Sequence, residues 1–570
     1  MKFRSVSPAV LLLVFFCLAL SSVVGDSPTM DEQNHIARGL AYLRTGDARL
    51  SVEHPPLVNG ISALFLLTEP VRLPTDDWSW EAGEWYRFAD QLLWHQGNDV
   101  ERLVFLARLP IIFLGLLLGA LLFRVTRRWS GQAAGLTALA LYLFDPNVLA
   151  HARYSTTDLG GTAFLFLAGV FLWEAGRSGY KIRGVVLAGA AYGLALSAKL
   201  SALVFGPIYG LIALISLIQR WRQGKRDVLA AVLRLGLLYL PMALLLVWVV
   251  FGFDYGALKE GGPALPMPIF WRGVGAIFDF SGGGRPAFLL GHFSSEGFWT
   301  YFPIAFGVKT PLPTLILIVW ALGFYLARTM SRARRPRRDL SLFLLLPPLL
   351  YFAISTRSAL NLGYRHLLPI LPFLYAFVGV QVGAARSGAA DLTALAADQI
   401  EGSQRSDSGG WRSRSLSLVL LFCLLWLMVG NLAIYPHYLS SFNELVGPAN
   451  GYRVLVDSNV DWGQDLKRLR GWMQENGVAR VKLAWFGSAY PDYYGIAYDP
   501  LPGLPRHFEL WEALPFDPAE PEPGVYAISV SILQEIHRRD EDKTAFAWFR
   551  AREPDDRVGY SILIYRVGIE

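Results

Sequence analysis

Cysteine and charge are both scarce in this chain. Only two cysteines, Cys17 and Cys423, occur in 570 residues, and both lie inside apolar runs. Neither a disulfide framework nor a cysteine metal site is therefore indicated. Charged residues make up 17% of the chain and hydrophobic residues 53%, and the mean hydropathy is +0.35. A chain this long and this apolar is not one soluble domain, and its composition predicts a polytopic α-helical membrane protein.

Two further classes are disfavoured. The net charge of +6 does not indicate a nucleic-acid partner, because the basic residues lie in short loops between apolar runs. In such loops they report the orientation of the chain in the bilayer. No internal sequence repeat is visible, which disfavours a transporter built from inverted repeats. We expect membrane lipids around the chain and no nucleic acid.

Eleven apolar segments are candidates to cross the membrane, which takes roughly 20 mostly apolar residues. The first also resembles a secretory signal, but we interpret it as an uncleaved anchor, since cleavage would remove it from the bundle. An alternative joins the fifth and sixth into one bent span, but later basic loops would then fall outside the cytoplasm. The segments lie near 8–25, 103–123, 131–149, 159–175, 184–198, 200–218, 232–252, 311–328, 340–355, 367–384 and 415–434.

Alternating spans place the basic loops together on one side, which predicts that this side and the N-terminus are cytoplasmic. The Ser/Gly-rich segment 386–414 is then a flexible cytoplasmic linker. Within the first outer loop, 26–102, a short apolar stretch at 57–67 indicates an interfacial helix. The other outer segments are 150–158, 253–310, 356–366 and everything after 434.

The chain changes character after residue 434. We predict a transmembrane unit over 1–434 and an extracytoplasmic α/β domain over 435–570, which is a usual length for a domain. Alternating apolar residues predict the strands, and one amphipathic pattern predicts a helix. The predicted strands are 454–456, 482–486, 525–530 and 561–567, and the predicted helix is 464–475.

Two adjacent carboxylates, Asp31 and Glu32, stand directly after the first apolar run and precede His35. At spacings of three and four, each carboxylate shares a helical face with the histidine, which suits proton transfer beside a membrane. The alternative is a capping box, since Thr29-x-x-Glu32 also matches that motif. Capping occupies Glu32 but leaves Asp31 free.

Cations stand at the outer ends of several predicted spans, notably Lys199, Lys309 and Arg365. A charge at membrane level is costly, so such a cation usually has a partner or a task. For Arg357 we favour snorkelling to the interface. Lys199 and Arg365 stand beside small or turn residues that let a phosphate headgroup approach, which favours an anion-binding role.

Further acids and histidines lie in the outer segments. Asp158 begins the fourth predicted span, where stabilisation by the helix dipole explains it as well as a site role does. Glu53 and His54 precede two prolines that hold the chain extended near the same membrane face. Outward carboxylates with membrane-level cations favour transfer of a group from a lipid phosphate, because the leaving phosphate needs positive charge and the incoming hydroxyl needs a base.

These residues occur in motifs that resemble the GT-C glycosyltransferases of the protein O-mannosyltransferase type. The bacterial branch includes the lipid A aminoarabinose transferases, and the likeness runs over most of 26–384. A motif in the tail resembles the carboxy-terminal region of a bacterial subgroup with no assigned substrate. The motifs are Asp31-Glu32-x-x-His35, Glu53-His54-Pro55-Pro56-Leu57, Thr157-Asp158-Leu159, Gly193 to Lys199, Lys309-Thr310-Pro311-Leu312-Pro313, Gly363-Tyr364-Arg365-His366-Leu367-Leu368-Pro369 and Asp457-Ser458-Asn459-Val460-Asp461-Trp462-Gly463-Gln464-Asp465.

The resemblance implies transfer with inversion from a polyprenyl-phosphate sugar to an extracytoplasmic acceptor, which is a protein, a lipid or a glycan, at a bacterial inner membrane. Asp31 matches the family's first-loop catalytic aspartate, and Glu32, the second catalytic candidate, would orient the donor or acceptor. No cofactor is certain, but some relatives use a divalent metal, for which Glu53, His54 and Asp158 are the candidate ligands. The substrate- and phosphate-binding candidates are His54, Asp158, Lys199, Lys309, Arg365 and His366.

Other interpretations remain open for the whole chain and for the tail. A transporter or lipid flippase would place its ionisable residues near the middle of its spans, whereas here they lie at span ends. A third interpretation, an assembly subunit whose tail binds a partner, does not explain the acids and cations of the outer side. In the tail, Asp457 and Asp461 with Trp462 fit a sugar-binding rim, and helix capping fits Asp461 equally well.

Overall fold

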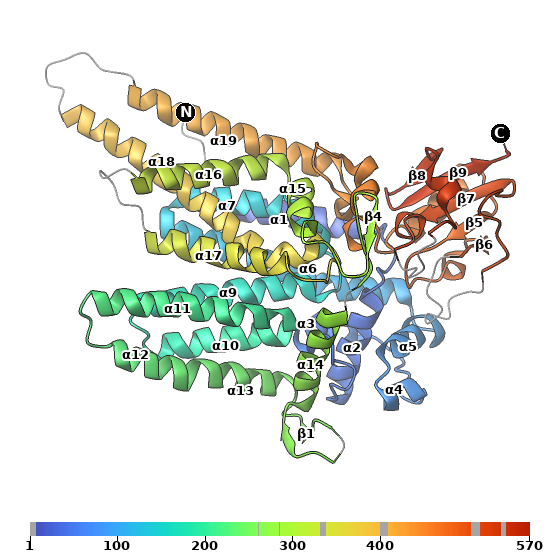
Figure 1. The fold of residues 1–570 in the computed structure, drawn as a ribbon, viewed down its shortest axis with the longest axis horizontal. Helices are drawn as coiled ribbons and strands as arrows, with labels where there is room; N and C mark the ends of the chain where they lie inside the picture. The colour runs from blue at the N-terminus through green and yellow to red at the C-terminus, as the bar shows by residue number, and fades with distance from the viewer. Residues whose placement is uncertain are drawn as a thin grey trace.

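The computed structural model shows a long helical bundle that carries a small α/β domain at one end (Figure 1). The structure describes residues 7–259, 261–283, 285–330, 338–398, 408–502, 513–536 and 543–569. The predicted fold class, a polytopic helical membrane protein with a C-terminal α/β region, is confirmed.

An apolar helix lies at each of the eleven predicted spans. Within the described residues, seven helices are long and apolar enough to cross a membrane, or eight if the bent pair α7 and α8 is one span. The predicted spans at 8–25, 184–198 and 340–355 fall on shorter apolar helices. The helices are α1 (Pro8–Val23), α6 (Val100–Ser130), α7 (Gln132–Leu143), α8 (Pro146–Ala152), α9 (Thr157–Arg177), α10 (Ile182–Ala198), η3 (Leu200–Val204), α11 (Phe205–Arg222), α12 (Val228–Arg234), η4 (Leu235–Tyr239), α13 (Leu240–Val250), α16 (Leu312–Met330), α17 (Arg338–Ser355), η5 (Tyr364–Ile370), α18 (Leu371–Asp398) and α19 (Ser408–Ala433).

The bend of 67° between α7 and α8 has a local cause. Pro146 cannot continue the preceding helix but suits the first turn of the next one. Asp145 caps that turn, since its Oδ1 accepts the backbone N–H of Asn147 at 2.8 Å. After α8 and a short connection, α9 begins at Thr157.

The predicted flexible linker 386–414 is helical over much of its length. Helix α18 continues to Asp398 and α19 begins at Ser408. The remaining part of the prediction, residues 399–407, lies outside the described residues.

The first outer loop folds into short helices against the bundle end. The predicted interfacial helix is present as α3 and η1, while its position relative to a membrane stays a prediction. The second long loop forms two hairpins around α14 and leads into α15. The elements are α2 (Glu32–Thr45), α3 (Pro56–Ala63), η1 (Leu64–Thr68), α4 (Trp78–Ala82), α5 (Trp85–Asp90), η2 (Gln91–His95), β1 (Tyr255–Ala257), β2 (Ala264–Pro266), α14 (Pro268–Gly283), β3 (Ala287–Leu289), β4 (His292–Ser294) and α15 (Tyr301–Lys309).

The tail, residues 435–570, contains a five-stranded mixed sheet in the order β6-β5-β7-β9-β8. Strand β5 pairs parallel with β6 and β7, and β9 pairs antiparallel with β7 and β8. Three of the four predicted strands and the predicted helix are confirmed. The elements are η6 (Tyr438–Ser440), η7 (Pro448–Arg453), η8 (Asp457–Asn459), α20 (Leu466–Glu475), β5 (Val481–Ala484), η9 (Asp492–Tyr494), β6 (Tyr498–Pro500), β7 (Gly524–Ser529), α21 (Val530–Leu533), α22 (Ala547–Arg550), β8 (Asp556–Val558) and β9 (Ile562–Val567).

The predicted strand at 454–456 is wrong. Val454 and Leu455 instead close a turn, because both backbone N–H groups bond to the carbonyl of Gly451 at 2.9 Å. All three residues are buried. A short apolar run predicts burial, and it does not distinguish a strand from a buried turn.

This turn begins a segment that packs the tail onto the bundle end. The backbone N–H of Met30 donates to the carbonyl of Trp462 at 2.8 Å, and that of Ser27 donates to Gln464 at 2.9 Å. Asn443 donates its backbone N–H to Val308 at 2.8 Å. The tail therefore lies directly against the first outer loop and against α15.

Candidate active site

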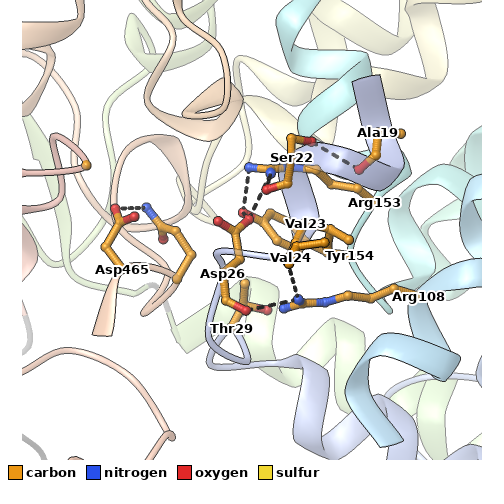
Figure 2. A network of polar contacts seen from close by, with 12 residues as sticks. Ala19, Ser22, Val23, Val24, Asp26, Thr29, Arg108, Arg153, Tyr154 and Asp465 are labelled. Carbon is orange, nitrogen blue, oxygen red and sulfur yellow. Dashed lines mark hydrogen bonds and ion pairs between the residues drawn. The ribbon is translucent and has the colours of Figure 1, made fainter. Parts of the chain in front are cut away.

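A buried polar network supports the start of the first outer loop (Figure 2). Asp26 is almost fully buried, and Arg153 lies 2.9 Å from its Oδ2 while Arg468 of the tail lies 2.5 Å from its Oδ1. The hydroxyl of Tyr154 donates to Asp26 at 2.8 Å. Burial opposes ionisation of Asp26, but Arg153, Arg468 and Arg108 outweigh it and lower its pKa. The loop, α8 and the tail are thus joined through one carboxylate.

Glu32 belongs to the same buried polar network. Its side chain is 0% exposed and forms a two-pronged ion pair with Arg108, at 2.8 Å from Nε and 2.6 Å from Nη2. The backbone N–H groups of Ser155 and Thr29 also donate to it, at 2.8 and 2.9 Å. The bond from Thr29 is the glutamate half of the capping box. These partners occupy both oxygens of Glu32 and turn it away from solvent.

Asp31 has the opposite environment. Its side chain is 30% exposed, and Nη1 of Arg365 donates to its Oδ2 at 2.9 Å. The same Nη1 lies 3.9 Å from Asp158, and the guanidinium lies over the ring of Trp462 with 4.5 Å to the centroid. Residues from the first loop, from η5, from α9 and from the tail therefore meet at Arg365.

Asp158 and Lys199 complete this group. The two side chains form an ion pair, with Asp158 buried and Lys199 17% exposed. Thr156 donates its hydroxyl to the other oxygen of Asp158 at 3.2 Å. We call Asp31, Asp158, Lys199 and Arg365 the Arg365 cluster. It brings together four residues that are spread over 335 positions of the sequence, from 31 to 365.

Two histidines line the neighbouring part of the first loop. The rings of His35 and His54 lie edge to face at 4.7 Å between centroids. Nδ1 of His35 lies 3.0 Å from Oδ1 of Asn59, and Nδ1 of His54 lies 3.3 Å from the hydroxyl of Thr157. Burial lowers the pKa of His35 to about 4, with Arg38 adding to the effect. Burial, His35 and Arg38 also hold the pKa of His54 well below its ordinary value, so both are neutral at pH 7.

The candidate metal ligands do not form a metal site. Glu53 pairs with Arg38 at 3.5 Å, His54 contacts Thr157, and Asp158 is committed to Lys199 and Arg365. Within the part of the chain that the structure describes, no group of three or more His, Cys, Asp and Glu side chains is arranged to hold an ion. The possible divalent metal therefore has no supporting geometry here.

Lys309 and His366 do not belong to the Arg365 cluster. Nζ of Lys309 donates to the carbonyls of Leu439 and Asn459, at 2.9 and 2.5 Å, and its side chain is buried. Burial lowers its pKa to about 7. His366 follows Arg365 directly, and its ring meets that of Phe302 edge to face at 6.3 Å. Among the described residues, Nε2 of His366 has no hydrogen-bond partner.

Sequence reasoning did not single out Arg108 or Arg38. Both are almost fully buried, and they neutralise Glu32 and Glu53. Arg108 interrupts the apolar run of the second predicted span, and an ionisable residue inside a span is a usable signal. Arg38 stands three residues after His35 on α2, where helical spacing places both on one face.

Residues 94–255 match the family described as dolichyl-phosphate-mannose-protein mannosyltransferase. The predicted family resemblance is confirmed. The matched stretch contains Asp158 and Lys199, while Asp31 and Arg365 lie outside it. A comparison with curated proteins gives no match.

Two solved structures match this chain at low sequence identity. One is ArnT from Cupriavidus metallidurans bound to undecaprenyl phosphate, with 13% identity, coverage of 98% of this chain and 97% of that one, and a TM-score of 0.46. Another is AglB from Archaeoglobus fulgidus in complex with an inhibitory peptide and a dolichol-phosphate, with 9% identity, coverage of 90% and 62%, and a TM-score of 0.46.

Proposed function

We propose that this protein is a membrane glycosyltransferase that moves a sugar from a polyprenyl-phosphate donor to an extracytoplasmic acceptor with inversion at the anomeric carbon. One observation carries the proposal. Asp31, a partly exposed carboxylate, lies at the bundle end in contact with Arg365, beside Lys199 and Asp158. A base beside two membrane-level cations is the arrangement that this transfer requires. The family name, dolichyl-phosphate-mannose-protein mannosyltransferase, supports a prenyl-phosphate sugar as donor.

In this mechanism Arg365 and Lys199 bind the phosphate of the donor. The hydroxyl oxygen of the acceptor forms a bond to the anomeric carbon while the bond from that carbon to the phosphate oxygen breaks. The phosphate leaves with the bonding electrons, and the two cations stabilise the negative charge that develops on it. Asp31 accepts the proton of the acceptor hydroxyl. A single displacement inverts the anomeric configuration.

Three other acidic or basic residues act through these groups. Asp158 contacts both Lys199 and Arg365 and thereby orients them toward the phosphate. Glu32 positions Asp31, because its ion pair with Arg108 holds the first turn of α2 in place. Lys309 secures the tail to α15 through two carbonyls of the tail, which makes its role indirect.

His54 and His366 are proposed to contact the donor. Both are only partly buried and flank the Arg365 cluster, His54 through Thr157 next to Asp158 and His366 through its neighbour Arg365. We place the protein in a bacterial inner membrane with its N-terminus in the cytoplasm and the tail outside, as the distribution of basic loops indicates.

The test is transfer by the purified protein in lipid nanodiscs. Undecaprenyl-phosphate sugars serve as donors and an envelope extract from a deletion strain as acceptor. Asp31→Asn is expected to lower kcat by about 10²- to 10⁴-fold, the contribution of a general base, with little change in donor affinity. Arg365→Ala and Lys199→Ala are expected to weaken donor binding as well. Asp499→Asn, on the tail surface, is the control.

Full turnover by Asp31→Asn would assign the base to another residue. Movement of the carrier lipid across the bilayer without any sugar transfer would indicate that the protein is a lipid flippase and not a glycosyltransferase. Profiling the lipid-linked sugars and surface glycans of the deletion strain identifies the sugar and the acceptor.

A further inference from the structure

The tail does more than cover the bundle end, because one of its segments enters the Arg365 cluster. Residues 457–462 follow the buried turn at 454–456 and reach the site beside Arg365. Trp462 lies under the guanidinium of Arg365 at 4.5 Å, and its carbonyl accepts the backbone N–H of Met30, the residue before Asp31. The segment is thus joined to both sides of the Asp31–Arg365 pair.

Bonds to the bundle fix the course of this segment. Oδ1 of Asn459 accepts the backbone N–H of Tyr364 at 2.9 Å, and its Nδ2 donates to the hydroxyl of Tyr301 at 2.9 Å. Ser458 donates its hydroxyl to the carbonyl of Leu362. Tyr364 and Leu362 lie on the loop that carries Arg365, and Tyr301 lies on α15. The orientation of the residue just before Ser458, Asp457, is therefore set by the bundle.

Asp457 is held in an uncommon conformation with its carboxylate partly exposed. Its φ of +58° is rare for a residue with a side chain, although aspartate tolerates it better than most. Its backbone N–H donates to the hydroxyl of Ser531 at 3.1 Å, and its carbonyl accepts the N–H groups of Val460 and Asp461 at 2.9 Å. Backbone strain of this kind persists where surrounding contacts over-determine it, and it is concentrated at functional sites.

One oxygen of this carboxylate is available to a ligand. Oδ1 accepts the N–H of Ser458 at 2.5 Å, whereas Oδ2 has no hydrogen bond to any described residue. Burial and the charge of Asp31 raise the pKa of Asp457 to about 6, and Arg365 opposes this rise. Both charged groups therefore lie close enough to Asp457 to act on it.

The neighbouring Asp461 differs from Asp457 in its exposure and in its hydrogen bonds. It is fully buried, and its oxygens accept the backbone N–H groups of Ser531 at 3.1 Å and of Gly463 at 3.3 Å. Asp461 is thus a structural residue. The predicted pair of rim carboxylates reduces to Asp457 alone.

We propose that Asp457 is a substrate-contacting residue that the tail contributes to the active site, where it accepts a hydrogen bond from a hydroxyl of the transferred sugar. This inference rests on the proposed function. If Arg365 binds the phosphate and Asp31 faces the acceptor, the transferred sugar lies between them. Asp158 is buried and paired with Lys199 and Thr156, whereas Asp457 offers a carboxylate oxygen beside both groups. A second nearby group points to a polar ligand, because Nδ1 of the buried His151, whose ring contacts Trp462 at 5.9 Å, has no partner among the described residues.

The experiment separates binding of the carrier from use of the sugar. The full chain, wild type or carrying Asp457→Asn, Asp457→Ala or the control Asp492→Asn, is placed in nanodiscs to measure affinity for undecaprenyl phosphate. The same variants are expressed in the deletion strain, and restoration of the missing glycan is measured per amount of protein. Asp492 is an exposed carboxylate of the same domain, which makes its substitution a matched control.

We expect both Asp457 variants to restore about ten- to a hundredfold less glycan, the loss of a hydrogen bond to a charged group. Their affinity for undecaprenyl phosphate should equal or exceed that of the wild type, because a negative charge beside Arg365 is removed. A merely structural role predicts the opposite, a weaker carrier affinity together with a lower Tm. That result, or full glycan restoration by Asp457→Asn, would overturn the inference. If the wild type itself binds no carrier and its deletion removes no glycan, the proposed function fails instead.

Discussion

At the scale of single residues, two adjacent carboxylates take opposite environments. Glu32 is enclosed by Arg108 and two backbone N–H groups, whereas Asp31 is partly exposed beside Arg365. Helical geometry explains the difference, because consecutive residues point about 100° apart. Glu32, on the inner face, therefore stabilises the loop, and Asp31 remains accessible to a substrate.

The structural role of the Glu32–Arg108 ion pair can be tested by removing one of its charges. Glu32→Gln leaves the buried guanidinium of Arg108 without its counter-charge, and removing one partner of a buried ion pair costs about 3–5 kcal/mol. We expect a correspondingly lower Tm in nanodiscs. Combining Glu32→Gln with Arg108→Met removes both charges and should recover part of the loss. Glu174→Gln is the control, since Glu174 pairs at 3.5 Å with Arg128, which is 72% exposed, and such pairs contribute at most about 1 kcal/mol.

His35 makes stability depend on pH. The unfolded chain protonates this histidine near pH 6.5, while the folded chain does so only near about pH 4, chiefly because of burial. The unfolded state therefore binds more protons between these values, so the stability that neutral His35 contributes is full above pH 6.5 and is lost as the pH falls toward 4.

Measurement of Tm between pH 7.5 and 5 checks this expectation. The Tm difference between the wild type and His35→Gln should be largest at pH 7.5 and should narrow toward pH 5. The exposed His292, changed to Gln, serves as the control and should give a Tm difference that does not vary with pH. A constant difference for His35→Gln would contradict the assignment of a neutral buried histidine.

At the scale of elements, the first outer loop depends on close packing of α2 against α3. A Cβ added at Gly39 would lie 2.0 Å from the carbonyl oxygen of Asn59, so only glycine allows this approach. Asn59 in turn contacts His35. The spacing of these two helices therefore determines where His35 and the adjacent His54 lie.

Gly39→Ala is expected to push α3 away from α2 and to destabilise the protein by about 1–3 kcal/mol, as overpacking does. Transfer activity should fall with it, because the histidines move relative to Asp31. Gly60→Ala is the matched control on α3, since its added Cβ would lie 3.6 Å from Leu43, an ordinary contact. Equal melting temperatures for the two variants would show that the helices separate at little cost.

At the scale of the whole molecule, the tail is bound to the bundle by polar contacts that are distant in sequence. Asn459 alone links it to Tyr364, Tyr301 and Lys309. These contacts hold Trp462 under Arg365. The site is therefore complete only when the tail is docked on the bundle.

Asn459→Ala should loosen this docking. Limited proteolysis is expected to cut the tail from the bundle several-fold faster than in the wild type, and transfer activity should fall while the strands of the tail remain folded. Asn476→Ala, at an exposed position of the same domain, should leave the proteolysis rate unchanged. Fast cleavage with full activity would show that the tail is dispensable for the site.

The sequence by itself determined the class of the protein and the positions of its apolar helices, because a span is a local property of consecutive residues. It also marked Asp31, Asp158, Lys199 and Arg365, since charged residues at the ends of apolar runs stand out from their surroundings. Sequence reasoning treated Glu32 as catalytic beside Asp31, and we now propose that it is a support. No local pattern distinguishes two adjacent carboxylates on a short helix.

Only the tertiary structure decided which charges meet. The pairing of Glu32 with Arg108 joins residues 76 positions apart, and the placement of Trp462 under Arg365 joins the tail to η5. The turn at 454–456 has the same apolar composition as a strand and differs only in what it packs against. Such pairings depend on the geometry of the folded chain, because ion pairs and aromatic contacts between distant segments have no periodicity that a sequence displays.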